Sequence, residues 1–202
     1  MKKVIIGTLI SVILLAVIIV GKSVSVYNNI IALDEGVKAQ WAQVENTYQR
    51  RFDLVPNLVA TVQGEADFEK STLTAVVDAR SHMGGVVKVD ENVLGDEAAM
   101  KRFQETQATL GGALQRLMAV SENYPNLKSN TSFQELRVQL EGAENRIAVE
   151  RKRYNEVVMQ YNTTIRVFPN SIIAGFAGAS PKVQFSADAG ASTAPAVKFD
   201  TK

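Results

Sequence analysis

The chain has 202 residues, no cysteine and a net charge of +1 that arises from 22 basic and 21 acidic side chains. This length allows one domain with a sizeable core. The balanced charge provides no broad basic face, so a nucleic-acid partner is not expected. The absence of cysteine excludes disulfides and thiolate metal sites.

An uncharged apolar run from Val4 to Val20 dominates the amino-terminal region. As a helix it covers about 25 Å, and lysines on its flanks can reach the headgroups of a bilayer whose core is about 30 Å thick. These lysines are Lys2, Lys3 and Lys22. The run predicts a transmembrane anchor at residues 1–22, with the lipid bilayer as its partner. The alternative is a cleaved signal peptide with small residues at 23–25, but a signal's apolar region is normally about 7–15 residues long.

The basic residues around this run give a nearly balanced orientation signal. Lys2 and Lys3 precede it, and Lys22 and Lys38 follow it. Lysines and arginines near a span tend to stay on the inner side of the membrane. Because two adjacent lysines lie at the amino end, we expect that end inside and the main domain outside.

An apolar stripe with the period of an α-helix follows the anchor, and we interpret residues 41–80 as the centre of one long helix. The stripe consists of Val37, Trp41, Val44, Tyr48, Phe52, Val55, Val59, Val62 and Ala66. No turn pair lies between residues 23 and 37, so this helix is expected to continue from the span. Pro56 predicts a kink, which we interpret as a fixed bend rather than a hinge, and Asp53 is expected to cap the restarted helix.

Two further long helices are predicted downstream of a turn-rich stretch at residues 80–96. The first runs over residues 97–122, with Asp96 as its N-cap, and ends before Pro125. The second runs over residues 132–168, opens with Ser132 and Glu135 as a capping box, and carries a heptad seam. The seam consists of Phe133, Leu136, Leu140, Ala143, Ile147, Glu150, Tyr154, Val157 and Tyr161. Residues 170–179 are either a short helix or a membrane-surface patch, and residues 180–202 are expected to be mostly disordered, with Phe185 isolated.

No pattern in the chain indicates catalysis. His82 is the only histidine and is interpreted as loop surface, and a di-metal bundle site would need a Glu-x-x-His from each of two helices. We therefore predict no enzyme activity and no catalytic, cofactor-binding or metal-binding residue. Glu150 occupies a seam position, so either the seam shifts locally to Val149 or Glu150 faces a partner. We hypothesise that it pairs with Arg50 or Arg51 and fixes the helix register.

Several motifs along the chain resemble the LemA family of bacterial membrane-anchored helical proteins. They include Tyr27-Asn28, Trp41, the run from Arg50 to Val59, Ala79-Arg80, residues 122–128, residues 140–147, Tyr154-Asn155, Tyr161-Asn162 and Phe168-Pro169. The resemblance implies one amino-terminal span in a bacterial inner membrane and an antiparallel bundle of long helices, and it transfers no catalytic residue. Together with the seam, the motifs give these structural residues: Trp41, Arg50, Arg51, Asp53, Pro56, Asn57, Arg80, Tyr124, Pro125, Glu150, Tyr154 and Asn155.

The predicted architecture is all-α, with an anchor at 1–22, an antiparallel bundle of three long helices and a short C-terminal helical segment at 23–179, and a tail at 180–202. The expected function is a membrane-anchored structural or scaffolding protein that forms homo-oligomers, since helical and heptad stripes coexist and Gly7 and Ser11 form a small-residue pair in the span. The alternative is an adaptor or sensor coupled to an unidentified membrane enzyme, protease or transporter. No cofactor and no small-molecule substrate are expected.

Overall fold

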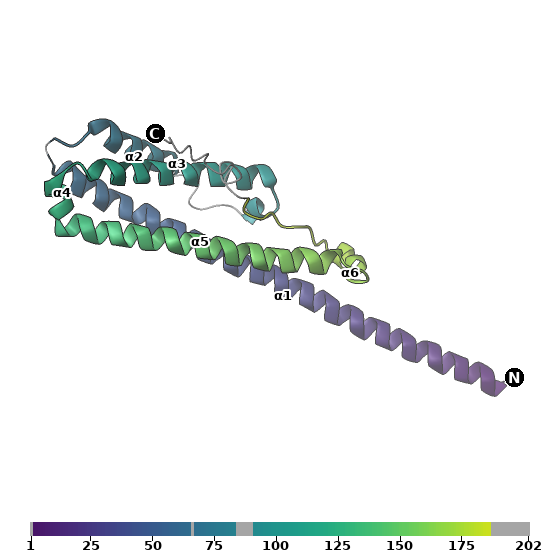
Figure 1. Cartoon of the computed structure of the whole chain (residues 1–202). Coiled ribbons are helices and arrows are strands. Elements are labelled where there is room, and N and C mark those ends of the chain that lie inside the picture. The colour runs from purple at the N-terminus through teal and green to yellow at the C-terminus, as the bar shows by residue number, and fades with distance from the viewer. Residues whose placement is uncertain (1, 66, 84–90, 187–202) are drawn as a thin grey trace, which may run out of the picture.

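The computed structural model describes residues 2–65, 67–83 and 91–186 (Figure 1). These residues form helices and contain no strand, which confirms the predicted all-α class. The helices are α1 (Lys2–Gln63), α2 (Lys70–Met83), the 3-10 helix η1 (Glu91–Leu94), α3 (Glu97–Ser121), α4 (Pro125–Ser129), α5 (Thr131–Arg166) and α6 (Asn170–Phe176).

Helix α1 continues without interruption from the apolar run into the bundle, as predicted. Its 62 residues correspond to a rod of about 93 Å. The prediction that this helix reaches residue 80 was wrong, because it ends at Gln63 and the chain turns back into α2. Pro56 lies inside α1, and Asp53 does not cap a restarted helix: its carboxylate accepts a hydrogen bond from Gln49 Nε2, 2.7 Å away on the preceding turn.

Helices α1 and α5 run antiparallel along most of the bundle, and α2 and α3 lie together on the same side of this pair (Figure 1). The bundle is therefore built from four long elements, because the segment expected to form one helix folds into α1 and α2. Two apolar clusters fill it. One surrounds Trp41 and Tyr154 in the half nearer to α6, and the other surrounds Leu58 and Leu114 in the half nearer to α4.

Side-chain caps determine where α3 and α5 begin. Asp96 accepts hydrogen bonds from the backbone nitrogens of Ala98 and Ala99 at 2.8 and 3.1 Å, as predicted. The cap of α5 is Asn130, whose side-chain oxygen accepts from Phe133 N at 3.1 Å, so the expected capping box at Ser132 was misplaced by two residues.

The carboxyl-terminal part of the described chain returns along the bundle after α6. Residues 180–186, which we call the strap, are extended and pack on α5, and Phe185 is buried (Figure 1). The expectation of disorder was therefore wrong for these seven residues. Residues 187–202, and with them Phe199, lie outside the described part of the chain.

Candidate functional site

A buried arginine joins three helices at the middle of the bundle. Arg51 of α1 is 3% exposed, and its guanidinium donates to Glu144 Oε1 of α5 at 2.8 Å. The same group donates to Gln107 of α3, at 2.6 Å to the side-chain oxygen and 3.1 Å to the backbone oxygen. Because guanidinium hydrogen bonds are directional, this contact fixes how α1, α3 and α5 are positioned relative to one another.

The hypothesis that Glu150 pairs with Arg50 or Arg51 was wrong. Glu150 accepts hydrogen bonds from Gln40 at 2.7 Å and from Arg153 at 2.8 Å, while Arg50 is exposed. The acidic partner of Arg51 is Glu144, which lies six positions earlier on the same helix. The ion pair expected between α1 and Glu150 of α5 is therefore formed by Arg51 and Glu144.

A polar pocket of about 280 Å³ opens beside Arg51. Its lining residues are Tyr48, Arg51, Gln104, Gln107, Ala108, Gly111, Gly112, Gln115, Glu144, Ile147 and Arg151. Gly111 brings the backbone of α3 close to Arg51: a Cβ at this position would lie in van der Waals contact, 3.5 Å from a guanidinium nitrogen. The Glu144 carboxylate is already held by Arg51, so the pocket can accommodate water or a small polar group but presents no free nucleophile and base as a pair.

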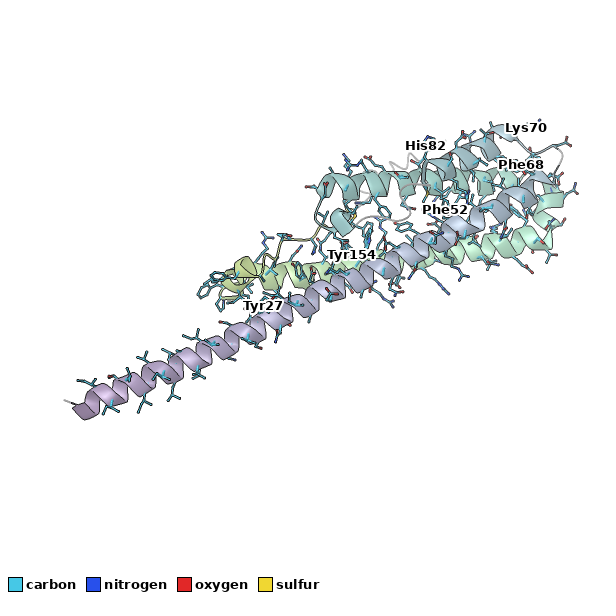
Figure 2. The ribbon with its side chains drawn as sticks, turned by 180° about the vertical axis from the view of Figure 1, so that it is seen from behind. Tyr27, Phe52, Phe68, Lys70, His82 and Tyr154 are labelled. Atoms are coloured by element: carbon cyan, nitrogen blue, oxygen red, sulfur yellow. The ribbon has the colours of Figure 1, made fainter. Side chains whose placement is uncertain are left out.

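An aromatic cluster forms the centre of the other half of the bundle. Trp41 lies 5.3 Å from both Phe103 and Tyr154 and 5.8 Å from Phe185, measured between ring centroids. The four rings come from α1, α3, α5 and the strap, so this cluster packs these four segments against one another. Figure 2 places Tyr154 at the middle of the bundle. Such ring pairs contribute about 0.5–1.5 kcal/mol each beyond the area that they bury.

Two asparagines of α5 hold the strap. The Asn155 amide donates to the Phe185 carbonyl at 3.0 Å and accepts from the Phe185 backbone nitrogen at 2.8 Å. Asn162, seven residues later, makes the same pair of bonds with the backbone of Lys182, both at 2.8 Å. Each side-chain amide therefore bonds one backbone N–H and one carbonyl of the strap. In a sheet, a neighbouring strand would provide these hydrogen bonds.

Further contacts fix the strap to α1 and η1. The Tyr154 hydroxyl donates to the Val183 carbonyl at 2.9 Å, and Val183 N donates to Leu94 O at 2.8 Å. The Lys182 ammonium lies 2.9 Å from Asp34. Burial raises the pKa of the Tyr154 phenol. Burial alone would also raise the pKa of Asp34, but hydrogen bonds from Lys182 and Lys38 outweigh it and hold that pKa below its usual value.

We predict that Asn155→Leu and Asn162→Leu each destabilise the strap by about 1–3 kcal/mol, because each removes two hydrogen bonds worth about 0.5–1.5 kcal/mol. Trp41 is the only tryptophan of the chain and stacks on Phe185, so release of the strap should shift its fluorescence to longer wavelength. The matched control is Asn145→Leu, at an exposed position of α5. Unchanged emission in both strap variants would contradict this assignment.

The remaining motif residues lie at different places on the bundle. Arg80 of α2 stacks over the Phe52 ring of α1 at 4.2 Å, and the Tyr124 hydroxyl donates to Asp67 O at 3.1 Å. Pro125 is the first residue of α4, and Pro56 is exposed. Three of the motif residues on α1 are among those that line a surface groove of about 610 Å³ beside α5: Arg50, Asp53 and Asn57. His82 is exposed, as predicted, but it lies in the last turn of α2 rather than in a loop.

The first half of α1 has the length and composition to cross a membrane. Every large apolar side chain between Ile5 and Val20 is more than half exposed, and Figure 2 shows these side chains pointing outward with no neighbouring element. Val20, the predicted end of the anchor, belongs to this segment, whereas the side chain of Val4 lies outside the described part. Within the described chain, nothing from the bundle covers this surface, which is consistent with a membrane anchor.

Sequence reasoning missed the partners of several residues that carry these contacts, two of which lie within recognised motifs. They are Gln107, Glu144, Asn162, Lys182 and Phe185. Asn162 had a usable signal, since it repeats the Tyr-Asn pair of Tyr154-Asn155 at heptad spacing. The partners of the other residues carry no local signal, because each partner is distant in the sequence.

The chain is similar to three curated proteins. They are Magnetosome protein MamQ 1 and Magnetosome protein MamQ 2 of Paramagnetospirillum magneticum and Magnetosome protein MamQ of Magnetospirillum gryphiswaldense. Each is 29% identical over 171 residues, which covers 75% of this chain and 61% of the relative. The chain thus spans about three fifths of the length of these relatives. The model of the LemA family matches residues 40–199, which is most of the chain, and the protein therefore belongs to the LemA family.

Proposed function

We propose that this protein is a membrane-anchored structural or scaffolding protein that self-associates. The observation that carries the proposal is the continuity of α1, which passes from an uncovered apolar segment into the core of the bundle without a break. A helix transmits position and rotation along its axis, so the bundle is held at a defined height and angle relative to the span. This geometry suits an element that spaces or organises other molecules at a bacterial inner membrane, with the bundle on the outer side.

The apolar segment of α1 offers a surface for self-association. Gly7 and Ser11 lie one helical turn apart, and a Cβ added at Gly7 would meet nothing within 4 Å. Small residues at this spacing let two helices approach closely in a bilayer, where van der Waals contact and not hydrophobic burial favours association. A second copy of the chain is therefore the partner that this face fits.

We expect the full chain to be larger than a monomer when it is extracted in mild detergent and examined by mass photometry. Gly7→Ile combined with Ser11→Ile should reduce the oligomer fraction, because the larger side chains separate the helix backbones. Ala16→Ile is the matched control, since residue 16 lies on the opposite face of α1 from residue 7 at about 100° per residue. A wild-type chain that is monomeric at every concentration would refute self-association.

The surface groove beside α5 favours a second function, that of an adaptor for another membrane protein. The groove is lined by Arg50, Asp53 and Asn57 of α1 and by Arg146 of α5. It therefore offers a partner both hydrogen-bond donors and acceptors, some of them charged. Affinity purification separates the two functions. A stoichiometric heterologous partner that is lost with Asp53→Lys would support the adaptor, whereas recovery of the chain alone would support the scaffold.

A further inference from the structure

The corner between α5 and α6 exposes large apolar side chains. Phe168 is 81% exposed, Phe176 is 88% exposed and Ile172 is 52% exposed. Ile172 and Phe176 are separated by four residues on α6 and so lie on one face of it. The opposite face is anchored: Ala174 is buried and Ile173 packs against the cluster that contains Ile30 of α1. Helix α6 is therefore held to the bundle by one side and presents an uncovered apolar side.

This corner lies at the end of the bundle that is nearer to the apolar segment of α1 (Figure 1). Along α1, Val20 is exposed, Ser23 and Val26 are half-buried, and Ile30 is fully buried. Of the bundle elements, α6 lies nearest to the exposed half of α1 (Figure 1). Ser23 and Val26 follow Val20 by about 5 and 9 Å along the axis. Because each headgroup region is about 5–8 Å thick, a span that ends at Val20 brings this end of the bundle to the bilayer surface.

Residues of α1 at the same level have the composition of a bilayer interface. Val24, Tyr27 and Ile31 are each more than two fifths exposed, so the apolar surface of α1 continues past the span. Figure 2 shows Tyr27 beside the end of the bundle that α6 forms. Exposed basic residues accompany them, Lys22 on α1 and Arg166 at the end of α5. Aromatic rings with nearby lysines and arginines are typical of the headgroup region.

We propose that the corner formed by Phe168, Ile172 and Phe176 is a second membrane contact, which inserts into the boundary between headgroups and acyl chains. The occupant of this apolar face is the lipid bilayer, because Val24, Tyr27 and Ile31 extend the exposed apolar surface of α1 from the span toward α6. The contact rests on the membrane anchor of the proposed function and extends it: the chain touches the bilayer at two points, which restrains the tilt of α1.

The absence of cysteine allows a direct test with single-cysteine variants of the full chain. Ile172→Cys and Phe176→Cys would each carry an environment-sensitive fluorophore after reconstitution into phosphatidylcholine–phosphatidylglycerol vesicles that contain lipids with a nitroxide near the headgroup. We expect loss of fluorescence at both positions relative to the same vesicles without nitroxide. Both side chains are exposed, so neither substitution removes core packing, and circular dichroism checks the helix content.

Two further single-cysteine variants serve as the negative and the positive control. Val138→Cys labels an exposed apolar position in the part of α5 nearer to α4, and no quenching is expected there. Leu15→Cys labels the span about 8 Å inside its end at Val20, and it should be quenched by lipids that carry the nitroxide on the acyl chain. If Leu15→Cys is quenched and Phe176→Cys is not, the second contact is refuted while the anchor stands. If Phe176→Cys instead changes emission only as the protein-to-lipid ratio rises, a second copy covers the corner and the inference is also wrong. If Leu15→Cys is not quenched, the anchor itself fails.

Discussion

Replacing Glu144 with alanine is expected to destabilise the folded chain by about 3–5 kcal/mol, more than replacing Arg51 with methionine. Without Glu144, the guanidinium of Arg51 remains buried with no counter-charge. Methionine at position 51 instead removes the buried charge and keeps much of the side-chain volume. It leaves Glu144, whose side chain is 42% exposed, free to be hydrated. The remaining cost in stability is that the side-chain oxygen of Gln107 loses its hydrogen-bond donor, about 1–3 kcal/mol.

Urea unfolding of the full chain in mild detergent, followed by Trp41 fluorescence, measures both variants. The double variant Arg51→Met with Glu144→Ala should regain most of the stability that Glu144→Ala alone loses, because no buried charge remains. Glu105→Ala is the control, since Glu105 forms an exposed pair with Lys101 at 3.9 Å and such pairs contribute within about 1 kcal/mol. Additive losses in the double variant would show that the pair does not act as a unit.

Trp41→Ala is expected to cost about 3–5 kcal/mol, the range for removing a large aromatic side chain from a core. Its ring contacts three others, from α3, α5 and the strap, so the cavity would open where four segments meet. The strap should loosen with it, because Phe185 then loses the ring on which it stacks.

Circular dichroism replaces fluorescence as the measurement for this variant. Trp41→Phe is the matched substitution: it keeps an aromatic ring and removes the indole nitrogen, which is buried without a hydrogen-bond partner among the described residues. The loss of folding stability in Trp41→Phe should be clearly smaller than the loss in Trp41→Ala. Equal losses would mean that the aromatic contacts which phenylalanine keeps do not hold the cluster together.

The periodic part of the sequence predicted the buried face of α1 closely. Val37, Trp41, Val44, Tyr48 and Val62 are all buried, because a core-facing stripe must repeat at the helix period. The same stripe concealed the end of the helix at Gln63. One face of helix α2 is also buried, so apolar residues continue through the turn, and Gly64 is a weak local stop signal.

The register of the bundle could not be derived from spacing alone. Glu144 and Glu150 are separated by about 9 Å along α5, and which of them faces Arg51 depends on how far α5 slides against α1. The strap was missed for a different reason. An extended segment bound by side-chain amides has no period, so Phe185 looked isolated although Asn155 was already recognised as part of a motif.

The continuity of α1 makes it a lever. From Val20 to its end at Gln63 the helix extends about 65 Å beyond the span. A tilt of about 20°, typical for a membrane helix, would carry the far end sideways by about 22 Å. With the span as the only membrane contact, a thinner or thicker bilayer would change that tilt and therefore how far the α4 end of the bundle reaches across the surface; a second contact at the α5–α6 corner would limit this displacement.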